Sequence, residues 1–154
     1  LRHMKKGATL AQAERAIQAC KDAGIKTYLF WVLGSPWETA ETAQDTIDFA
    51  RKLDGDFCEF HIAYPFPGTP LHDICTEEGL LGEEQLTGRN VKQAVARSYA
   101  LTAADLKKIQ TRAMRSFYLR PSYVARTLRS IDSPVLLQCA LLPSARRTLI
   151  SRPS

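Results

Sequence analysis

A glycine and a carboxylate lie four residues apart in the stretch "VLGSPWET" (residues 32–39), where an apolar, β-favouring run ends. Gly34 could simply end a strand in a turn, or it could let the backbone approach a bound ligand closely, because it has no Cβ. Glu38 could stabilise the N-terminus of a following helix by about 0.3 to 1 kcal/mol, or it could contact a ligand. This stretch is the first candidate for a binding site.

A second group of polar side chains lies in the stretch "FCEFHIAY" (residues 57–64). In a strand, Glu59 and His61 point to the same face, because side chains alternate with a period of two. Tyr64 comes at the end of that strand. On the inner face of a barrel these groups would line a reaction cavity and could orient a substrate. On an open sheet they would simply meet water.

The four cysteines, Cys20, Cys58, Cys75 and Cys139, are too scattered to form a metal site of the CxxC type. We therefore expect free, mostly buried thiols. A disulfide is the alternative, and the absence of a secretory signal pattern argues against it.

Two predicted strands would position the candidate residues. Residues 25–33 are apolar at successive positions, which predicts a strand buried on both faces of a parallel sheet. Residues 57–64 predict a second strand, with Phe60 and Ile62 on the face opposite the polar pair. Both candidate stretches then lie at the carboxyl ends of neighbouring parallel strands, where α/β folds gather their binding sites.

Helices with clear start and stop signals surround these strands. Thr9 and Gln12 predict a capping box, and Gly24 ends the helix that follows. A short helix is expected over residues 71–79, after the breaker "PFPGT". The helix between the two strands is predicted from an apolar stripe, which consists of Ala43, Ile47, Ala50 and Leu53.

The last third of the chain is predicted to be entirely helical. Thr102 can cap a helix that runs to about residue 118. Pro121 and Ser133–Pro134 mark two further helix starts, and Pro143 should end or kink the last helix. The inward side of the first of these helices is expected to carry Leu106, Ile109, Ala113 and Phe117.

The net charge of +5 is spread unevenly. The chain carries −3 up to Ala100 (11 basic and 14 acidic residues) and +8 from Leu101 onward (10 and 2). A basic tail could bind phosphate groups or nucleic acid. Its charges are spread over several helices with few aromatics, however, which favours a solvated face or an intramolecular partner. No apolar run approaches the roughly 20 residues of a membrane span, so we expect no span and a cytoplasmic location.

Four motifs carry a family resemblance: Lys6-Gly7, Ala23-Gly24-Ile25, Leu33-Gly34-x-Pro36-x-Glu38-Thr39 and Pro65-x-Pro67-Gly68-Thr69. Together they resemble the second half of the barrel in radical S-adenosylmethionine (radical SAM) enzymes. The nearest likeness is to the subgroup that often carries an N-terminal cobalamin-binding domain and includes the anaerobic magnesium-protoporphyrin monomethyl ester cyclases. The resemblance covers residues 5–81 well and residues 101–150 more loosely.

The resemblance implies an α/β fold that is the C-terminal part of a partial parallel (β/α)6 barrel. Residues 1–81 would supply the last two strands and their helices, residues 82–100 a connection, and residues 101–154 a helical extension. It also implies contacts with S-adenosylmethionine at Leu33, Gly34, Ser35 and Glu38, and a cavity for a small-molecule substrate lined by Glu59, His61 and Tyr64.

The resemblance also implies a four-iron four-sulfur (4Fe-4S) cluster held by three cysteines in a CxxxCxxC motif, which this sequence lacks. We therefore expect a fragment of a longer oxidoreductase or cyclase-type enzyme that is inactive alone. Its partners would be the missing N-terminal half of the barrel and a cobalamin-binding domain, with cobalamin as a further cofactor. The intact enzyme would cleave S-adenosylmethionine to a 5′-deoxyadenosyl radical.

A stand-alone basic helical module that binds RNA or a partner protein is the alternative. Truncation has a further consequence, because the strand within residues 26–33 would lack a neighbour on one edge. We expect the fragment to cover this edge by self-association or with its own C-terminal helices.

Overall fold

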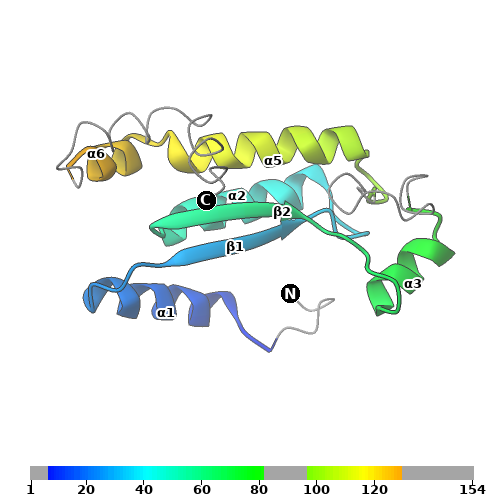
Figure 1. Ribbon diagram of the computed structural model, residues 1–154, viewed down its shortest axis with the longest axis horizontal. Coiled ribbons are helices and arrows are strands. Elements are labelled where there is room, and N and C mark those ends of the chain that lie inside the picture. Colours follow the sequence, from blue (N-terminus) through cyan, green and yellow to red (C-terminus); the bar gives the residue numbers. More distant parts are fainter. Residues whose placement is uncertain (1–6, 82–96, 130–154) are drawn as a thin grey trace, which may run out of the picture. The chain divides into compact units, whose positions relative to one another are not determined.

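The computed structural model describes residues 7–81 and 97–129 of the 154-residue chain. The chain divides into two compact units, Leu1–Phe117 and Tyr118–Ser154. None of the described helices is long and apolar enough to cross a membrane. The order of elements is α1 (Leu10–Asp22), β1 (Tyr28–Leu33), α2 (Ala40–Leu53), β2 (Phe57–Ile62), α3 (Pro70–Glu77), α5 (Ala103–Tyr118) and α6 (Pro121–Arg129) (Figure 1).

The described sheet of the first unit consists of β1 and β2, paired in parallel as predicted. The register runs from Tyr28 opposite Phe57 to Leu33 opposite Ile62. The pairing extends one residue further, because the Ala63 N–H donates to the Leu33 carbonyl at 2.7 Å. Parallel strands need a crossover connection, and α2 supplies it. The α/β class predicted from the sequence is therefore confirmed.

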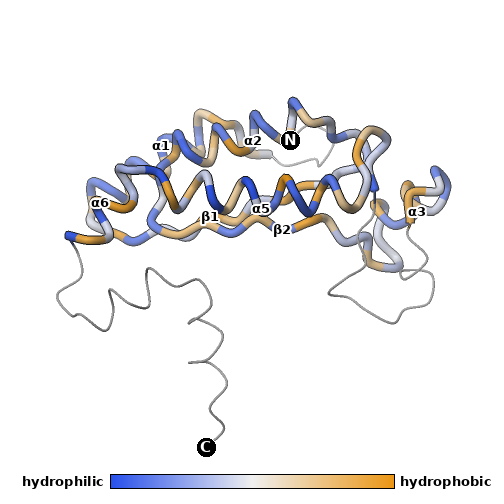
Figure 2. Tube along the Cα trace, turned by 90° about the horizontal axis from the view of Figure 1, so that it is seen from above, coloured by the Kyte–Doolittle hydropathy of each residue, from blue (hydrophilic) through white to orange (hydrophobic). Residues whose placement is uncertain are grey.

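Helices α1 and α2 lie on one face of this sheet, and α5 runs along its β2 edge, as two perpendicular views show (Figures 1 and 2). Lys52 of α2 pairs with Glu14 of α1 at 2.8 Å, and Arg112 of α5 donates to Gln44 of α2 at 2.8 Å. These contacts place α2 between the other two helices. The opposite face of the sheet carries the exposed side chains of both strands.

The helix boundaries follow from local capping. The predicted capping box at Thr9 and Gln12 is present, and Gly24 lies just beyond α1 with φ +68°. A second capping box, formed by Thr39 and Thr42, begins α2. These caps satisfy backbone donors that the first helical turns leave without a partner.

The core lies between the sheet and its helices. All four residues predicted on the inward side of α5 (Leu106, Ile109, Ala113 and Phe117) are buried. So are the four residues of the predicted α2 stripe, Ala43, Ile47, Ala50 and Leu53. Full burial stabilises by about 1.5 to 3 kcal/mol for each large apolar side chain, so these two helices hold the layer together.

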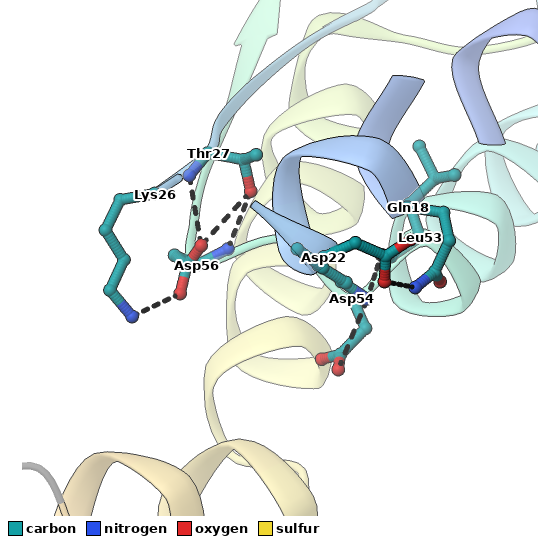
Figure 3. A network of polar contacts seen from close by, with 8 residues as sticks. Gln18, Asp22, Lys26, Thr27, Leu53, Asp54 and Asp56 are labelled. Carbon is teal, nitrogen blue, oxygen red and sulfur yellow. Dashed lines mark hydrogen bonds and ion pairs between the residues drawn. The ribbon is translucent and has the colours of Figure 1, made fainter. Parts of the chain in front are cut away.

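A polar network fixes the start of both strands (Figure 3). The Asp56 carboxylate accepts from the Thr27 N–H at 3.0 Å and from the Lys26 ammonium at 2.9 Å. The Asp56 N–H donates in return to the Thr27 hydroxyl at 3.2 Å. Burial alone would raise the pKa of Asp56, but the Lys26 and Thr27 contacts outweigh it and lower the pKa below 3.8.

The prediction that the first strand is buried on both faces is wrong. The strand begins at Tyr28, and Tyr28, Phe30 and Val32 are 47%, 65% and 46% exposed. Only the alternate residues face the helices, where Trp31 meets the edge of Phe49 with ring centroids 5.9 Å apart. We call the uncovered side the open face; it carries Tyr28, Phe30, Val32, Phe57, Glu59 and His61.

In the second unit, α6 begins at Pro121 as predicted. The Tyr123 ring has the Arg120 and Arg126 guanidinium carbons 5.5 and 5.3 Å from its centroid. Tyr118 meets the same ring edge-on at 5.1 Å. Part of the basic tail therefore contacts aromatic rings within its own unit.

Several predictions lie outside the described residues. They concern Lys6, the helix start at Ser133–Pro134, Pro143 and Cys139. Of the predicted connection at residues 82–100, only residues 97–100 are described.

Candidate functional site

The two candidate stretches lie at the same end of the sheet. Because β1 and β2 are parallel, the loop after Leu33 and the loop after Ile62 both begin at the carboxyl ends of the strands. The hydrogen bond from Ala63 to Leu33 joins the two strands just before the loops diverge. The structure therefore brings the glycine stop and the proline–glycine loop side by side, as predicted.

The Glu38 carboxylate closes the first loop on itself. It accepts hydrogen bonds from the N–H groups of Gly34 and Ser35, and the Glu38 N–H donates to the Ser35 carbonyl at 2.9 Å. Glu38 is only 8% exposed. Burial raises its pKa above the ordinary value of 4.5, although the two N–H groups act in the opposite direction. Its contacts in the described structure are thus with the loop backbone.

Position 34 requires a glycine for two reasons, the backbone conformation and the close packing of neighbouring side chains. Its φ of +87° lies in the left-handed region that favours glycine. A Cβ at this position would lie 3.0 Å from Leu106 Cδ1 and 3.2 Å from Ile62 Cγ2. The space beside Gly34 is thus filled by α5, which explains the glycine by packing.

Ser98 fastens the same loop from a segment far along the chain. Its hydroxyl donates to the Glu38 carbonyl at 2.8 Å and accepts from the Leu101 N–H at 2.9 Å. The next residue, Tyr99, donates its N–H to the Pro36 carbonyl at 2.7 Å. Sequence reasoning missed Ser98, because nothing local marks a serine whose partner is 60 residues away.

The other predicted site residues at the strand ends differ in how much of their side chain is exposed. Leu33 is fully buried on the face that the helices cover, so only its backbone faces the strand ends. Ser35 is half-buried. On the second loop, Tyr64 is half-buried with its ring 4.5 Å from that of Phe66. Ser35 and Tyr64 are therefore the predicted residues at the strand ends with side-chain surface left for a ligand.

Glu59 joins two other polar groups on the open face. It accepts a 2.6 Å hydrogen bond from the Tyr28 hydroxyl, and its second oxygen lies 3.0 Å from His61 Nε2. The prediction that Glu59 and His61 share a face is thus confirmed. Tyr28 was missed, because every position of β1 is apolar and such a run does not mark which residues will be exposed.

Aromatic rings form a continuous row across the open face. Phe57, Tyr28, Phe30 and His61 follow one another with centroid distances of 5.7, 4.7 and 5.9 Å. Their planes are inclined by only 27°, 16° and 20°, so the rings stack. The face is thus aromatic with one carboxylate in its middle.

A metal centre is not formed by residues 7–81 and 97–129, in which no three His, Cys, Asp or Glu side chains are suitably grouped. In the described part of the chain, Cys20, Cys58 and Cys75 are not joined to one another by a disulfide, and Cys58 and Cys75 are buried. Burial raises the pKa of the Cys75 thiol, which disfavours the thiolate that metal binding needs.

Comparison with known proteins found two relatives. An uncharacterized methyltransferase of Pyrococcus horikoshii is 32% identical over 128 residues, which are 83% of this chain and 28% of that protein. The anaerobic magnesium-protoporphyrin IX monomethyl ester cyclase of Rubrivivax gelatinosus is 37% identical over 68 residues, or 44% of this chain and 12% of the cyclase. No family model matches. The chain is therefore similar to a methyltransferase and a cyclase, and it spans less than a third of either.

Proposed function

We propose that the chain is part of a radical SAM enzyme and supplies part of the cofactor pocket and one wall of the substrate cavity. The observation that carries this proposal is the parallel pair with helices on one face only and two irregular loops at one end. In a (β/α) barrel the helices lie outside and the other face of the strands points to the interior. The similarity to a methyltransferase and to a cyclase agrees with this class.

The loop after β1 suits a cofactor pocket through its backbone. Gly34 permits the left-handed turn, and Glu38 holds the N–H groups of Gly34 and Ser35. We assign Glu38 a positioning role and Ser35 the role of the side chain that reaches the cofactor. Leu33 would contribute its backbone at the rim. The bound cofactor would supply the hydrogen-abstracting group, and the protein would position it and exclude water.

The iron–sulfur cluster does not fit the described residues, since they offer no suitable group of ligands. We therefore assign the cluster to the N-terminal half of the barrel, and cobalamin, where the parent enzyme uses it, to a separate domain. Glu59, His61 and Tyr64 would face the substrate across the cavity that the two halves enclose. On this proposal the chain alone is inactive.

Reconstitution with iron and sulfide tests the proposal. We expect this chain to take up no stoichiometric 4Fe-4S cluster, measured by iron content and absorption, and to leave S-adenosylmethionine intact. A full cluster with cofactor cleavage would contradict it. The coding sequence before Leu1 provides a second test, because a CxxxCxxC motif must lie there.

The alternative of an RNA-binding module would use the basic residues of α5. Lys107, Lys108, Arg112 and Arg115 lie along this helix, but Arg112 already contacts Gln44 of α2. We expect the electrophoretic mobility of mixed RNA to be unchanged by the chain at low salt. A shift that disappears steeply with added salt would favour the alternative instead.

A further inference from the structure

We propose that the open face binds a flat, conjugated organic molecule that carries a cationic or N–H donor group. This inference deepens the proposed function and rests on it in one respect, since the open face would then be the wall of the substrate cavity. The binding itself follows from the arrangement of six side chains on two strands: Tyr28, Phe30, Val32, Phe57, Glu59 and His61.

The apolar character and exposure of this surface indicate a ligand site. Phe30 is 65% exposed and Tyr28, Val32 and Phe57 between 39% and 47%. A contiguous apolar patch of this kind is costly to leave in water and commonly marks an interaction site. The helices already cover the opposite face, so this patch is the side of the sheet that remains for a partner.

The stacked row determines the shape of the ligand. Side chains stand roughly perpendicular to a sheet, so rings that stack through their faces turn their edges outward. Phe57, Tyr28, Phe30 and His61 stack in this way. Ring edges are electropositive and prefer the face of another π-system. A flat conjugated molecule lying across the row satisfies this preference, whereas a small compact cation would not.

Glu59 determines the charge of the ligand. Its carboxylate lies directly opposite Phe30 in the register and is held in place by Tyr28 and His61. A carboxylate has about four acceptor positions, and these two neighbours use one oxygen each, so further donors can bind. No Lys or Arg belongs to the open face as the structure describes it. A cationic or N–H donor group on the ring system therefore complements the face.

A second copy of the chain is a poorer occupant of the same surface. A symmetric pair of open faces would bring the Glu59 carboxylates of both copies toward one interface, and buried like charges oppose association. The ring edges of the two rows would also meet edge to edge. The observations therefore favour a small aromatic ligand.

Binding of proflavine, a planar tricyclic cation, tests the inference by fluorescence titration of the chain. We expect saturable binding that Phe30→Ala and Glu59→Gln each weaken about tenfold or more. The planar-aromatic anion 1-anilinonaphthalene-8-sulfonate should bind at least tenfold more weakly than proflavine. Tetramethylammonium should not compete, because it lacks a ring system.

Two matched variants serve as controls. Phe66→Ala removes another exposed ring, 54% accessible, from the loop after β2, and Glu77→Gln removes an exposed carboxylate from α3. Neither should change proflavine affinity, and urea unfolding of all variants would establish that they fold. Affinity for proflavine that is unaffected by Phe30→Ala and Glu59→Gln, or anion binding of equal strength, would overturn the inference. Failure of the radical SAM assignment would leave proflavine binding unchanged, so the two proposals can fail separately.

Discussion

Glu38 is a buried carboxylate whose described hydrogen bonds stay within the loop that it stabilises. Burying an ionised group is costly, and the N–H groups of Gly34 and Ser35 offset only part of that cost, so burial is the larger effect on its pKa. The same two contacts fix the backbone at the end of β1. Glu38 is therefore part of the internal hydrogen bonding that shapes this loop.

The pH dependence of stability should report this burial. The folded chain keeps a proton on Glu38 to a higher pH than the unfolded chain, so the contribution of Glu38 to the free energy of unfolding falls as pH rises from 4.5 through the folded pKa. We expect the stability difference between wild type and Glu38→Gln to fall with pH over this window, measured by urea unfolding. A stability difference that stays constant over this window would contradict burial as the cause of the raised pKa of Glu38.

Gly34→Ala should be more destabilising than the matched change at Gly68. Both glycines have positive φ, +87° and +81°, so both substitutions introduce backbone strain of about 1 to 3 kcal/mol. Only at Gly34 would the new Cβ meet close neighbours, whereas no atom lies within 4 Å of the Gly68 position. Urea unfolding of both variants measures the difference. Equal losses in the free energy of unfolding would mean that the contact of the new Cβ with Leu106 does not add to the destabilisation.

The sequence identified Gly34 and Glu38 as special residues but left their roles open. A glycine after a strand and an acid at a helix start are local signals. The packing of Leu106 on Gly34 and the bond from Ser98 to Glu38 are not, because they depend on how distant segments meet. Local chemistry therefore predicted that these residues have special backbone roles, and tertiary contacts decide what those roles are.

At the scale of elements, periodicity predicted α5 well and β1 poorly. The four inward residues of α5 recur at helical spacing among polar residues, so one face alone could be buried. In β1 every position from Tyr28 to Leu33 is apolar, and such a run gives no sign of which face a helix will cover. The prediction of two buried faces therefore failed at Tyr28, Phe30 and Val32, which are exposed.

The network between the strand starts should depend on Asp56 more than on Lys26. The Lys26 side chain is 74% exposed and that of Asp56 only 18%, and exposed ion pairs contribute about 0 to 1 kcal/mol. Hydrogen bonds to charged groups contribute about 1.5 to 3 kcal/mol, and Asp56 accepts two from Thr27. We therefore expect Asp56→Ala to lower the free energy of unfolding at pH 7 by more than Lys26→Met does.

The pH dependence of the stability loss in Asp56→Ala provides the control. The pKa of Asp56 is lowered, so its stabilisation is complete above 3.8 and is lost as pH falls through the folded pKa. Urea unfolding at pH 7 and near pH 2.5 should show the gap between wild type and Asp56→Ala narrowing in acid. A gap that stays constant would indicate a steric effect of the substitution.

At the scale of the whole molecule, the two outer edges of the sheet differ. Phe57 and Ala63 donate toward β1, so the backbone groups of Phe60 point to the outer edge of β2. The Phe60 carbonyl accepts from Gln110 of α5 at 2.6 Å, which covers that edge. The described sheet has no strand beyond β1 on its other edge. Helix α5 thus protects the outer edge of β2. The outer edge of β1 is the one that was expected to lack a neighbour.

Self-association through the β1 edge is therefore the expected behaviour of the chain in solution. Leu33 accepts from β2, so by alternation the N–H of Val32 points to the outer edge, where a strand of another copy could pair with it. Val32→Pro removes this backbone N–H without removing a hydrogen bond to β2. Val32→Thr keeps the N–H and, like proline, replaces the apolar valine side chain, so it serves as the matched control. Sedimentation velocity should show association that increases with concentration in wild type and Val32→Thr and is weakened in Val32→Pro. A wild-type chain that stays monomeric at every concentration would mean that the β1 edge is covered from within the same molecule. Equal association of Val32→Pro and Val32→Thr would mean that the chains associate through another surface.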